Sequence, residues 1–309
     1  MPFMNPRQAR LIDPILSTVA TGYVNAQLVG NVLFPCVPVM VSGGQVIEFG
    51  LEAFRDYHAR RSPGAAVKQL SLGYSGKPFA LVQDALSGKV PVEQMRDTSI
   101  VPGIDLASRT IHGVMRILTL SLERDQAALA INASHYDSNH KSAPSGADKW
   151  GAGTSDPSAQ ISAAREAVRA STGVYPNTVL LSPSAFSATQ QHPKILDRTK
   201  YTSSDSITTN MLAKLWNVET VVVGAAISAD DAGVMSDVWG NNVVLAYVPP
   251  HSSGMEEPSY GYTYTLDGNP QVAAPYYDEN TRSWIYPIFY ERVPVLTGIT
   301  SGFLIANPV

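Results

Sequence analysis

The alternation of apolar and polar positions predicts a long β-hairpin in the first third of the chain. Strand-like patterns cover residues 45–49 and resume between residues 70 and 82. Residues 55–64, between these patterns, are polar and rich in turn formers. We therefore expect an extended hairpin over residues 45–90. A two-stranded hairpin is only marginally stable alone in water, so this one needs something else to pack on it.

A helical pattern follows, and it is the longest in the chain. It runs from Ile104 to about Ala133, about 28 residues or roughly 40 Å, and we expect Asp105 to be its N-cap. Its apolar positions share one face, so the helix can serve as the backbone of the molecule. His112 lies beside that face, and we interpret it as a packed core or boundary residue, not a ligand.

Residues 156–254 alternate helices and strands, which is typical of an α/β sandwich. Asp156 and Pro157 have the types of an N-cap and a first-turn residue, as do Ser182 and Pro183 after the apolar strand 179–181. Beyond residue 255 the chain is strand-rich again, and we expect these strands, including 302–305, to pack beside the long helix.

The first forty residues are predicted to form an arm, because prolines interrupt them and only a few apolar anchors are present. We expect this arm to be ordered only by contacts outside its own core. Cys36 is the single cysteine, which excludes an internal disulfide, and its apolar neighbours indicate a buried thiol.

Composition indicates a molecule that is covered by other subunits. Only 16% of residues are charged, against about 25% in ordinary soluble proteins, while 44% are hydrophobic. The net charge of −4 argues against broad nucleic-acid binding. We find neither an apolar window of about 18 residues nor a signal-peptide pattern, and therefore expect a soluble protein made in the cytoplasm.

Candidate chemistry is sparse, and we predict no catalytic residue, no metal and no cofactor. Ser182 and Ser184 lack the glycine-flanked elbow of α/β-hydrolases and are better explained as helix-start residues. His135, Asp137 and His140 could meet at a metal, but they lie in a polar loop that has no rigid support. A hydrolytic enzyme is the weakest interpretation.

The order of several motifs resembles the major capsid proteins of tailed phages, with the Hong Kong 97-type fold. The resemblance rests on the following segments: 34–38 (Phe-Pro-x-Val-Pro), 192–198, 221–224, 239–247, 258–264 and 302–305. It implies an α+β fold with four parts. These are an N-terminal arm (1–44), an extended hairpin loop (45–90), a peripheral domain with a long spine helix (91–155 and 255–309) and an axial domain (156–254).

The resemblance also implies partners. The chain would assemble with itself into hexamers and pentamers of an icosahedral shell, first as a procapsid, around double-stranded DNA that it does not read by sequence. A portal is implied, and the absence of a long charged N-terminal segment implies a separate scaffolding protein. A decoration protein is left open.

Two clusters are candidates for contacts between subunits, although a solvated loop or an intrachain role explains them equally well. The candidates are Arg55, Arg60, Arg61, Arg198, Lys200 and Tyr201.

The implied fold is also compatible with an alternative function and with a covalent modification. An encapsulin-type compartment would carry protein cargo instead of DNA. A covalent cross-link between subunits would join a lysine such as Lys68 or Lys77 to an asparagine such as Asn269 or Asn280, which requires a specific buried environment for the lysine.

Overall fold

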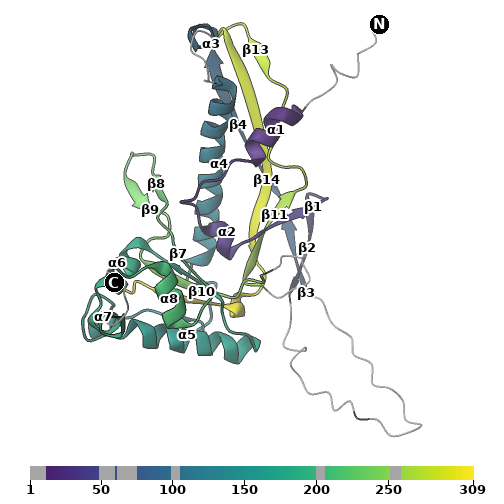
Figure 1. Cartoon of the computed structure of the whole chain (residues 1–309). Coiled ribbons are helices and arrows are strands. Elements are labelled where there is room, and N and C mark those ends of the chain that lie inside the picture. Colours follow the sequence, from purple (N-terminus) through teal and green to yellow (C-terminus); the bar gives the residue numbers. More distant parts are fainter. Residues whose placement is uncertain (1–11, 49–59, 61–74, 99–104, 200–205, 251–258) are drawn as a thin grey trace.

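The structure is a computed structural model of the whole chain, and it describes residues 12–48, 60, 75–98, 105–199, 206–250 and 259–309. These residues form an elongated part, built on one long helix and one long strand, and a compact part at one end of it (Figure 1). Two small hairpins project from this body, one from each part.

The elongated part is a six-stranded sheet covered by helices. Its centre is a 14-residue strand, β14, which pairs antiparallel with β4 over ten residues, from Ser283 opposite Pro91 to Arg292 opposite Val82. The remaining strands pair directly or indirectly with β14, in the order β1-β11-β14-β12 with β13 at its side. The bounds are β1 Cys36–Val39, β4 Val82–Pro91, β11 Gly261–Leu266, β12 Gln271–Val272, β13 Tyr276–Asp278, β14 Ser283–Leu296, α1 Pro14–Thr21, α2 Gly30–Leu33, α3 Val92–Thr98 and α4 Leu106–Ala130.

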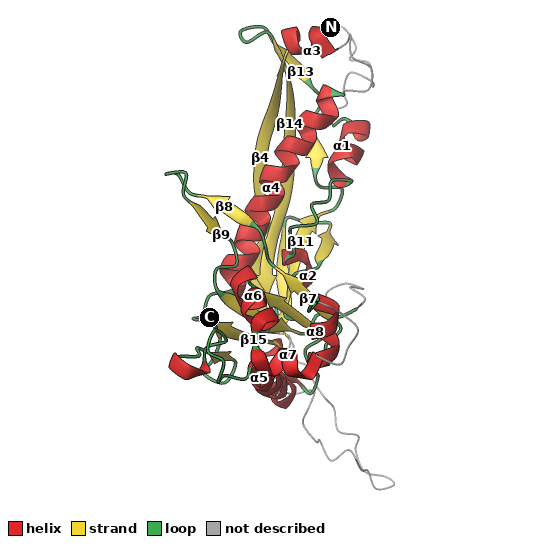
Figure 2. Ribbon diagram, turned by 60° about the vertical axis from the view of Figure 1, so that its left-hand side comes forward, coloured by secondary structure: helices red, strands yellow, loops and turns green. Residues whose placement is uncertain are grey.

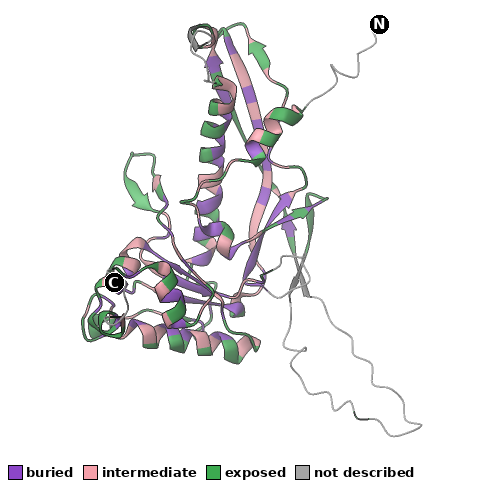
Figure 3. Cartoon of the chain, viewed as in Figure 1, coloured by how far each residue is buried: buried purple, intermediate pink, exposed green. Residues whose placement is uncertain are grey.

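Helix α4 confirms the predicted long helix. It has 25 residues, about 37 Å, and the carboxylate of Asp105 accepts a hydrogen bond from the N–H of Ala107 as its N-cap. Its buried face packs on β4 and β14, while the opposite face stays exposed along its length (Figure 3). His112 is an exposed boundary residue whose ring lies 5.6 Å from that of Tyr23.

The compact part is a five-stranded mixed sheet in the order β5-β15-β10-β6-β7, with helices against it (Figure 2). Side chains alternate between its two faces, so both faces are buried. One face packs on α5 and α8, and the other packs on the end of α4 and on α2. The bounds are β5 Lys141–Ser142, β6 Thr178–Leu181, β7 Thr220–Val223, β10 Asn242–Ala246, β15 Gly302–Ala306, α5 Pro157–Thr172, α6 Pro183–Gln191, α7 Pro193–Thr199, α8 Thr209–Trp216, and the short 3-10 helices η2 Gly146–Asp148 and η3 Ile299–Ser301.

The helix starts predicted at Asp156 and Ser182 are confirmed. The side chains of Asp156 and Ser182 accept from the N–H groups of Ala159 and Ala185, and Gly173 ends α5 at a φ of 74°. Helix α6 ends at Gln191, and Pro193 opens a second short helix, α7.

The second strand of the hairpin predicted at residues 45–90 ends earlier than expected, at Ala80. Strands β2 (Gly43–Glu48) and β3 (Ser75–Ala80) form its antiparallel base, and the segment beyond that base lies outside the described residues except for Arg60. Residues 82–90 do not belong to it, because β4 pairs with β14. The predicted boundary at residue 90 is therefore wrong by about one strand.

The end of the chain is also placed differently from the expectation. Strand β15 pairs with β10 in the compact sheet and not beside the elongated strands. Trp150, in the segment 91–155 that was assigned to the peripheral domain, is buried in the same core as α5. The reason is register: Phe303 and Ile305 complete one apolar face of that sheet, while Leu304 fills the other.

The prediction of an arm is wrong for the described residues 12–39. Helix α1 packs on α4, Leu33 and Phe34 are fully buried, and β1 pairs parallel with β11. This segment therefore buries its apolar anchors against its own chain. Cys36 is exposed, which corrects the expected buried thiol, because the alternation in β1 turns Val37 and Val39 inward.

Candidate functional site

Glu123, near the end of α4, joins three segments of the chain. Its Oε1 accepts hydrogen bonds from the backbone N–H of Val29, at 3.0 Å, and from the indole N–H of Trp239, at 2.7 Å. Its Oε2 accepts from the N–H of Gly30, at 2.8 Å. Val29 and Gly30 lead into α2, while Trp239 comes from the turn before β10 in the compact part. One carboxylate thus ties the N-terminal segment and both parts together.

Burial sets the electrostatics of this carboxylate, since Glu123 is only 2% exposed. Desolvation raises its pKa above the ordinary value, and this outweighs the hydrogen bonds from Gly30, Trp239 and Val29, which lower it. A buried acidic group with all its acceptors satisfied is a structural anchor. We call Glu123 and the three donors that bind it the joint.

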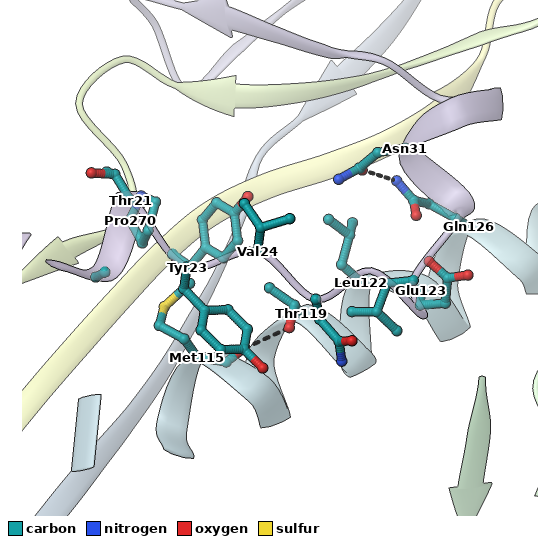
Figure 4. A pocket seen from close by; sticks show the side chains of 14 residues that line it. Thr21, Tyr23, Val24, Asn31, Met115, Thr119, Leu122, Glu123, Gln126 and Pro270 are labelled. Atoms are coloured by element: carbon teal, nitrogen blue, oxygen red, sulfur yellow. Dashed lines mark hydrogen bonds between the residues drawn. The ribbon is translucent and has the colours of Figure 1, made fainter. Parts of the chain in front are cut away.

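Gln126, one turn further along α4, extends the joint. Its amide nitrogen donates to Asn31 Oδ1 and to Thr263 Oγ1, each at 2.9 Å. Figure 4 shows Glu123 and Gln126 side by side, with Asn31 facing Gln126. Gly30 is required here, because a Cβ would overlap the Gln126 side-chain oxygen and lie 2.8 Å from Glu123 Oε2.

An apolar cluster surrounds these polar contacts. It contains Phe34, Trp239 and Tyr260, all fully buried, and joins α4 to one face of the compact sheet. The hydroxyl of Tyr136 is hydrogen-bonded to that of Tyr260 and donates to the carbonyl of Ala130, at 2.7 Å. The two parts of the molecule are therefore held by both packing and hydrogen bonds.

A cavity of about 350 Å³ lies next to the joint, between α4 and the segment from α1 to α2 (Figure 4). Glu123 and Gln126 line one end of it, where both Glu123 oxygens and the amide nitrogen of Gln126 are already hydrogen-bonded within the chain. The remaining lining is Ala20, Thr21, Tyr23, Val24, Asn25, Leu28, Asn31, Met115, Thr119, Leu122, Pro270 and Tyr290. No nucleophile and base face each other across it.

A second buried charge holds α4 to the long sheet. The guanidinium of Arg292, on β14, donates from Nη2 to Asp84 Oδ2 at 2.9 Å and to the carbonyl of Leu118 at 2.6 Å. It also lies 4.3 Å from the centre of the Tyr290 ring, a cation–π contact. This side chain ties β4, β14 and α4 together.

Of the three residues considered for a metal site, the structure brings Asp137 and His140 together, and His135 lies elsewhere. The third member of the observed cluster is Ser171. His140 Nδ1 lies 2.8 Å from Asp137 Oδ1, and its Nε2 lies 2.8 Å from Ser171 Oγ. Bonds from His140 and Asn139 lower the pKa of Asp137 even though desolvation, the largest effect on it, raises that pKa. His135 instead contacts the carbonyl of Leu129.

This Ser–His–Asp arrangement is a structural clamp. Ser171 is in the last turn of α5, and its hydroxyl lies within hydrogen-bonding distance of the carbonyls of Ala167, Val168 and Thr300. A catalytic serine needs N–H donors for the developing oxyanion, whereas a helix C-terminus presents carbonyl oxygens. Among the described residues, no group of three or more His, Cys, Asp or Glu side chains is arranged to hold a metal ion either.

Ser155 and His192 form another buried pair that cannot activate a nucleophile. The N–H of Lys194 donates to His192 Nδ1, so the ring proton is on Nε2, which faces Ser155 Oγ at 3.0 Å. Ser155 donates its own proton to the carbonyl of Ala152, at 2.8 Å. The hydroxyls of Ser182 and Ser184 are hydrogen-bonded to each other, and that of Ser184 also donates to Asn241 Oδ1. These contacts agree with the predicted roles of both serines at a helix start.

The predicted contact residues lie apart from the joint. Arg198 is exposed on α7 and makes no ion pair with any described residue, and Arg60 is exposed in the hairpin. Arg55, Arg61, Lys200 and Tyr201 lie outside the described residues, as does Lys68.

Other polar side chains around Arg198 are used within the chain. The amide of Gln190 donates to the carbonyl of Ile207, and Lys194 Nζ donates to that of Thr154, at 3.0 Å. For the cross-link, Asn269 Oδ1 accepts from the N–H of Glu291, which engages one of the two candidate asparagines.

Sequence reasoning missed Glu123 altogether. The signal was present, because Glu123 directly follows Leu122 in the apolar stripe of α4, where a charged residue needs a partner. The three donors that satisfy it are far away in sequence, so no local pattern could identify them.

No protein-family model matches the chain. A curated relative, the major capsid protein of Burkholderia phage BcepMu, is 34% identical over 305 residues, which cover 96% of this chain and 97% of that protein. The crystal structure of a phage-related protein from Bordetella bronchiseptica RB50 is 44% identical, with a TM-score of 0.85, and the match covers 97% of this chain and 99% of that one.

More distant solved structures share the fold alone. The satellite phage P4 procapsid matches with a TM-score of 0.54 at 10% identity, over 95% of this chain and 98% of that one. An encapsulin complex from Synechococcus elongatus matches with a TM-score of 0.50 at 11% identity, over 92% and 88%. Among the described residues, no helix has the length and apolar character needed to cross a membrane.

Proposed function

The chain belongs to the family of phage major capsid proteins, and from this premise we propose that it closes an icosahedral shell of hexamers and pentamers around double-stranded DNA. The single observation that carries the proposal is the similarity to the major capsid protein of phage BcepMu along 96% of the chain. The low charged fraction of 16% supports it, since a shell subunit is covered by its neighbours on several sides.

We further propose a division of labour within the subunit. The compact part would act as the axial domain around the centre of each capsomer, and the elongated part would act as the peripheral domain. The fold supports this division because the joint holds the two parts at a fixed angle through buried contacts. The shell would be assembled in the host cytoplasm with a separate scaffolding protein and a portal, and would become the capsid of the virion.

Electron microscopy of the purified protein tests the proposal. We expect closed particles when the chain is expressed with its scaffolding protein, and capsomers or irregular shells without it. A protein that stays small under both conditions contradicts the proposal. Particles filled with one protein cargo, and never with DNA during infection, would favour the encapsulin-type alternative.

We propose that the tip of the β2–β3 hairpin covers a neighbouring subunit through Arg55, Arg60 and Arg61. Deleting residues 55–64 should leave a soluble subunit with unchanged unfolding, because the hairpin base β2–β3 is outside the deletion. Such a subunit should fail to close shells, as judged by sedimentation and microscopy. Normal particles from this deletion would contradict the assignment.

A further inference from the structure

A small hairpin on the compact part presents an unusual exposed face. Strands β8 (Ile227–Ala229) and β9 (Met235–Asp237) pair only with each other, and they project away from the compact sheet (Figures 1 and 2). Ile227 is opposite Asp237, and Ala229 is opposite Met235, so these four side chains share one face of the ribbon. Ile227 is 53% exposed and Met235 is 66% exposed.

The same hairpin is acidic. Asp230 and Asp231 form its turn, and with Asp237 they give three carboxylates and no cation within residues 227–237. The Oδ1 of Asp230 is bound to the N–H groups of Ala232 and Val234, which fixes the turn. A two-stranded ribbon of this kind is marginal in water by itself, so its apolar face calls for a partner.

The exposed side of α4 has the complementary character. Arg109, Arg116 and Arg124 lie seven and eight residues apart, about two helical turns each, and so project from roughly the same side. All three are exposed, and none forms an ion pair with a described residue. Ile117, which is 59% exposed, lies among them. Two acidic residues of this region are already engaged: Asp105 caps the helix, and the exposed Asp125 interacts electrostatically with the adjacent Arg124.

The two surfaces match in scale as well as in charge. Arg116 and Arg124 are about 12 Å apart along the helix. Asp231, at the hairpin turn, is roughly 10 Å from Asp237 along the ribbon. Met235 lies between these acidic ends, while Ile227 lies directly opposite Asp237. On the helix, Ile117 follows Arg116 and precedes Arg124. The hairpin therefore combines exposed apolar side chains with negative charge, and the helix face combines Ile117 with mainly positive charge.

We propose that the β8–β9 hairpin of one subunit binds the exposed face of α4 on a neighbouring copy of this chain. The contact is heterologous, because a patch on one copy meets a different patch on the next, and contacts of this kind close rings. This inference rests on the proposed shell function. It favours a second copy as the occupant because both complementary surfaces belong to the same chain. Within the part of the chain that the structure describes, neither the three arginines nor the carboxylates of Asp231 and Asp237 form an ion pair.

Disulfide trapping tests the contact in assembled particles. The parent is Cys36→Ser, since Cys36 is exposed and is the single cysteine. One tagged chain carries Ile117→Cys, a second chain with another tag carries Met235→Cys, and both are co-assembled and mildly oxidised. We expect a linked dimer bearing both tags in particles and not in free subunits. Ser236→Cys, on the other face of the hairpin, is the matched control and should give at least tenfold less of this dimer.

Several outcomes would overturn the contact. Normal particles without an Ile117–Met235 link would leave the shell function standing and remove this contact, whether the helix face is then empty or covered by DNA or a scaffold segment. A link formed within one chain that carries both cysteines, with no dimer, would assign the contact to the subunit itself. A parent that forms no particles at all would remove both the shell function and the contact.

Charge reversal gives an independent readout. Arg116→Glu with Arg124→Glu should lower particle yield at least tenfold at low salt, as should Asp231→Arg with Asp237→Arg, because each places like charges in contact. Combining the four changes should restore at least half of the parent yield. A combination no better than the worse of the two pairs, or reversals without effect, would contradict the contact.

Discussion

The joint and the β8–β9 hairpin use similar residue types for opposite purposes. At the joint, the carboxylate of Glu123 is buried, and three donors from the same chain satisfy it. In the hairpin, three aspartates and several apolar side chains face solvent. The difference separates what folds the subunit from what is left for assembly. Changes at the joint should lower the stability of a free subunit, whereas changes on the exposed surfaces should affect only the shell.

The strongest way to break this comparison is to remove the buried carboxylate. Glu123→Ala leaves the N–H groups of Val29, Gly30 and Trp239 without acceptors, which should lower the free energy of unfolding by roughly 3 kcal/mol or more. Chemical denaturation of the free subunit measures this. Glu93→Ala, on the exposed face of α3, is the control and should change little. Equal, small effects of both changes would show that the joint does not hold the fold.

A methyl group added at Gly30 should have the next largest effect. Gly30→Ala forces overlap with Gln126 and a close contact with Glu123, and strain of this kind costs about 1–3 kcal/mol. Gly113→Ala is the matched control, because nothing lies within 4 Å of its added Cβ in α4. The control should stabilise the free subunit by up to about 1 kcal/mol. Stability changes of the same sign in thermal unfolding would contradict the packing described at Gly30.

The pH dependence of stability sharpens the assignment of Glu123. Because burial raises its pKa, the folded subunit binds this proton more tightly than the unfolded chain does. The contribution of this bound proton to the free energy of unfolding is therefore fully present below the ordinary pKa of glutamate. It is lost as pH rises through the raised pKa of Glu123. Glu123→Gln removes this titration.

The measurement compares the two proteins from pH 7 to pH 4. The stability of the unmodified protein relative to Glu123→Gln should increase toward acidic pH, with the remaining titrating groups cancelling in the difference. A difference that is constant, or that shrinks toward acid, would show that the pKa of Glu123 is not raised.

The smallest effect on the free subunit is expected at Arg198. Its side chain is exposed and makes no ion pair with a described residue, so Arg198→Ala should change the free energy of unfolding by less than about 0.5 kcal/mol. If it contacts a neighbouring subunit, the yield of capsomers should still fall, as measured by sedimentation. A loss of several kcal/mol in the free subunit would instead place Arg198 in the fold.

Local signals explain what the sequence could predict. Asp105, Asp156 and Ser182 begin helices as expected, since a cap and the following residues are neighbours in the chain. The long helix was predictable from its apolar stripe.

Pairing between distant segments explains the errors. Whether residues 302–306 join the compact or the elongated sheet depends on the partner strand, and an apolar strand fits either. Likewise, the arm at 12–39 looked too short of apolar residues to bury itself, but Leu33 and Phe34 enter a core built mainly by residues far away in the sequence. The donors to Glu123 are about 93 to 116 positions away, beyond any local pattern.

A cryo-EM reconstruction of the assembled particle tests the central claim most directly, because it shows which surfaces are covered by neighbours. We predict a closed shell in which the joint keeps the contacts of Glu123 within each subunit. In the same shell, the β8–β9 hairpin should lie on α4 of the adjacent subunit, with Asp237 or Asp231 facing Arg116 or Arg124. A closed shell in which the hairpin and the arginines of α4 both face solvent, or in which the Glu123 contacts are made between subunits, would contradict this account.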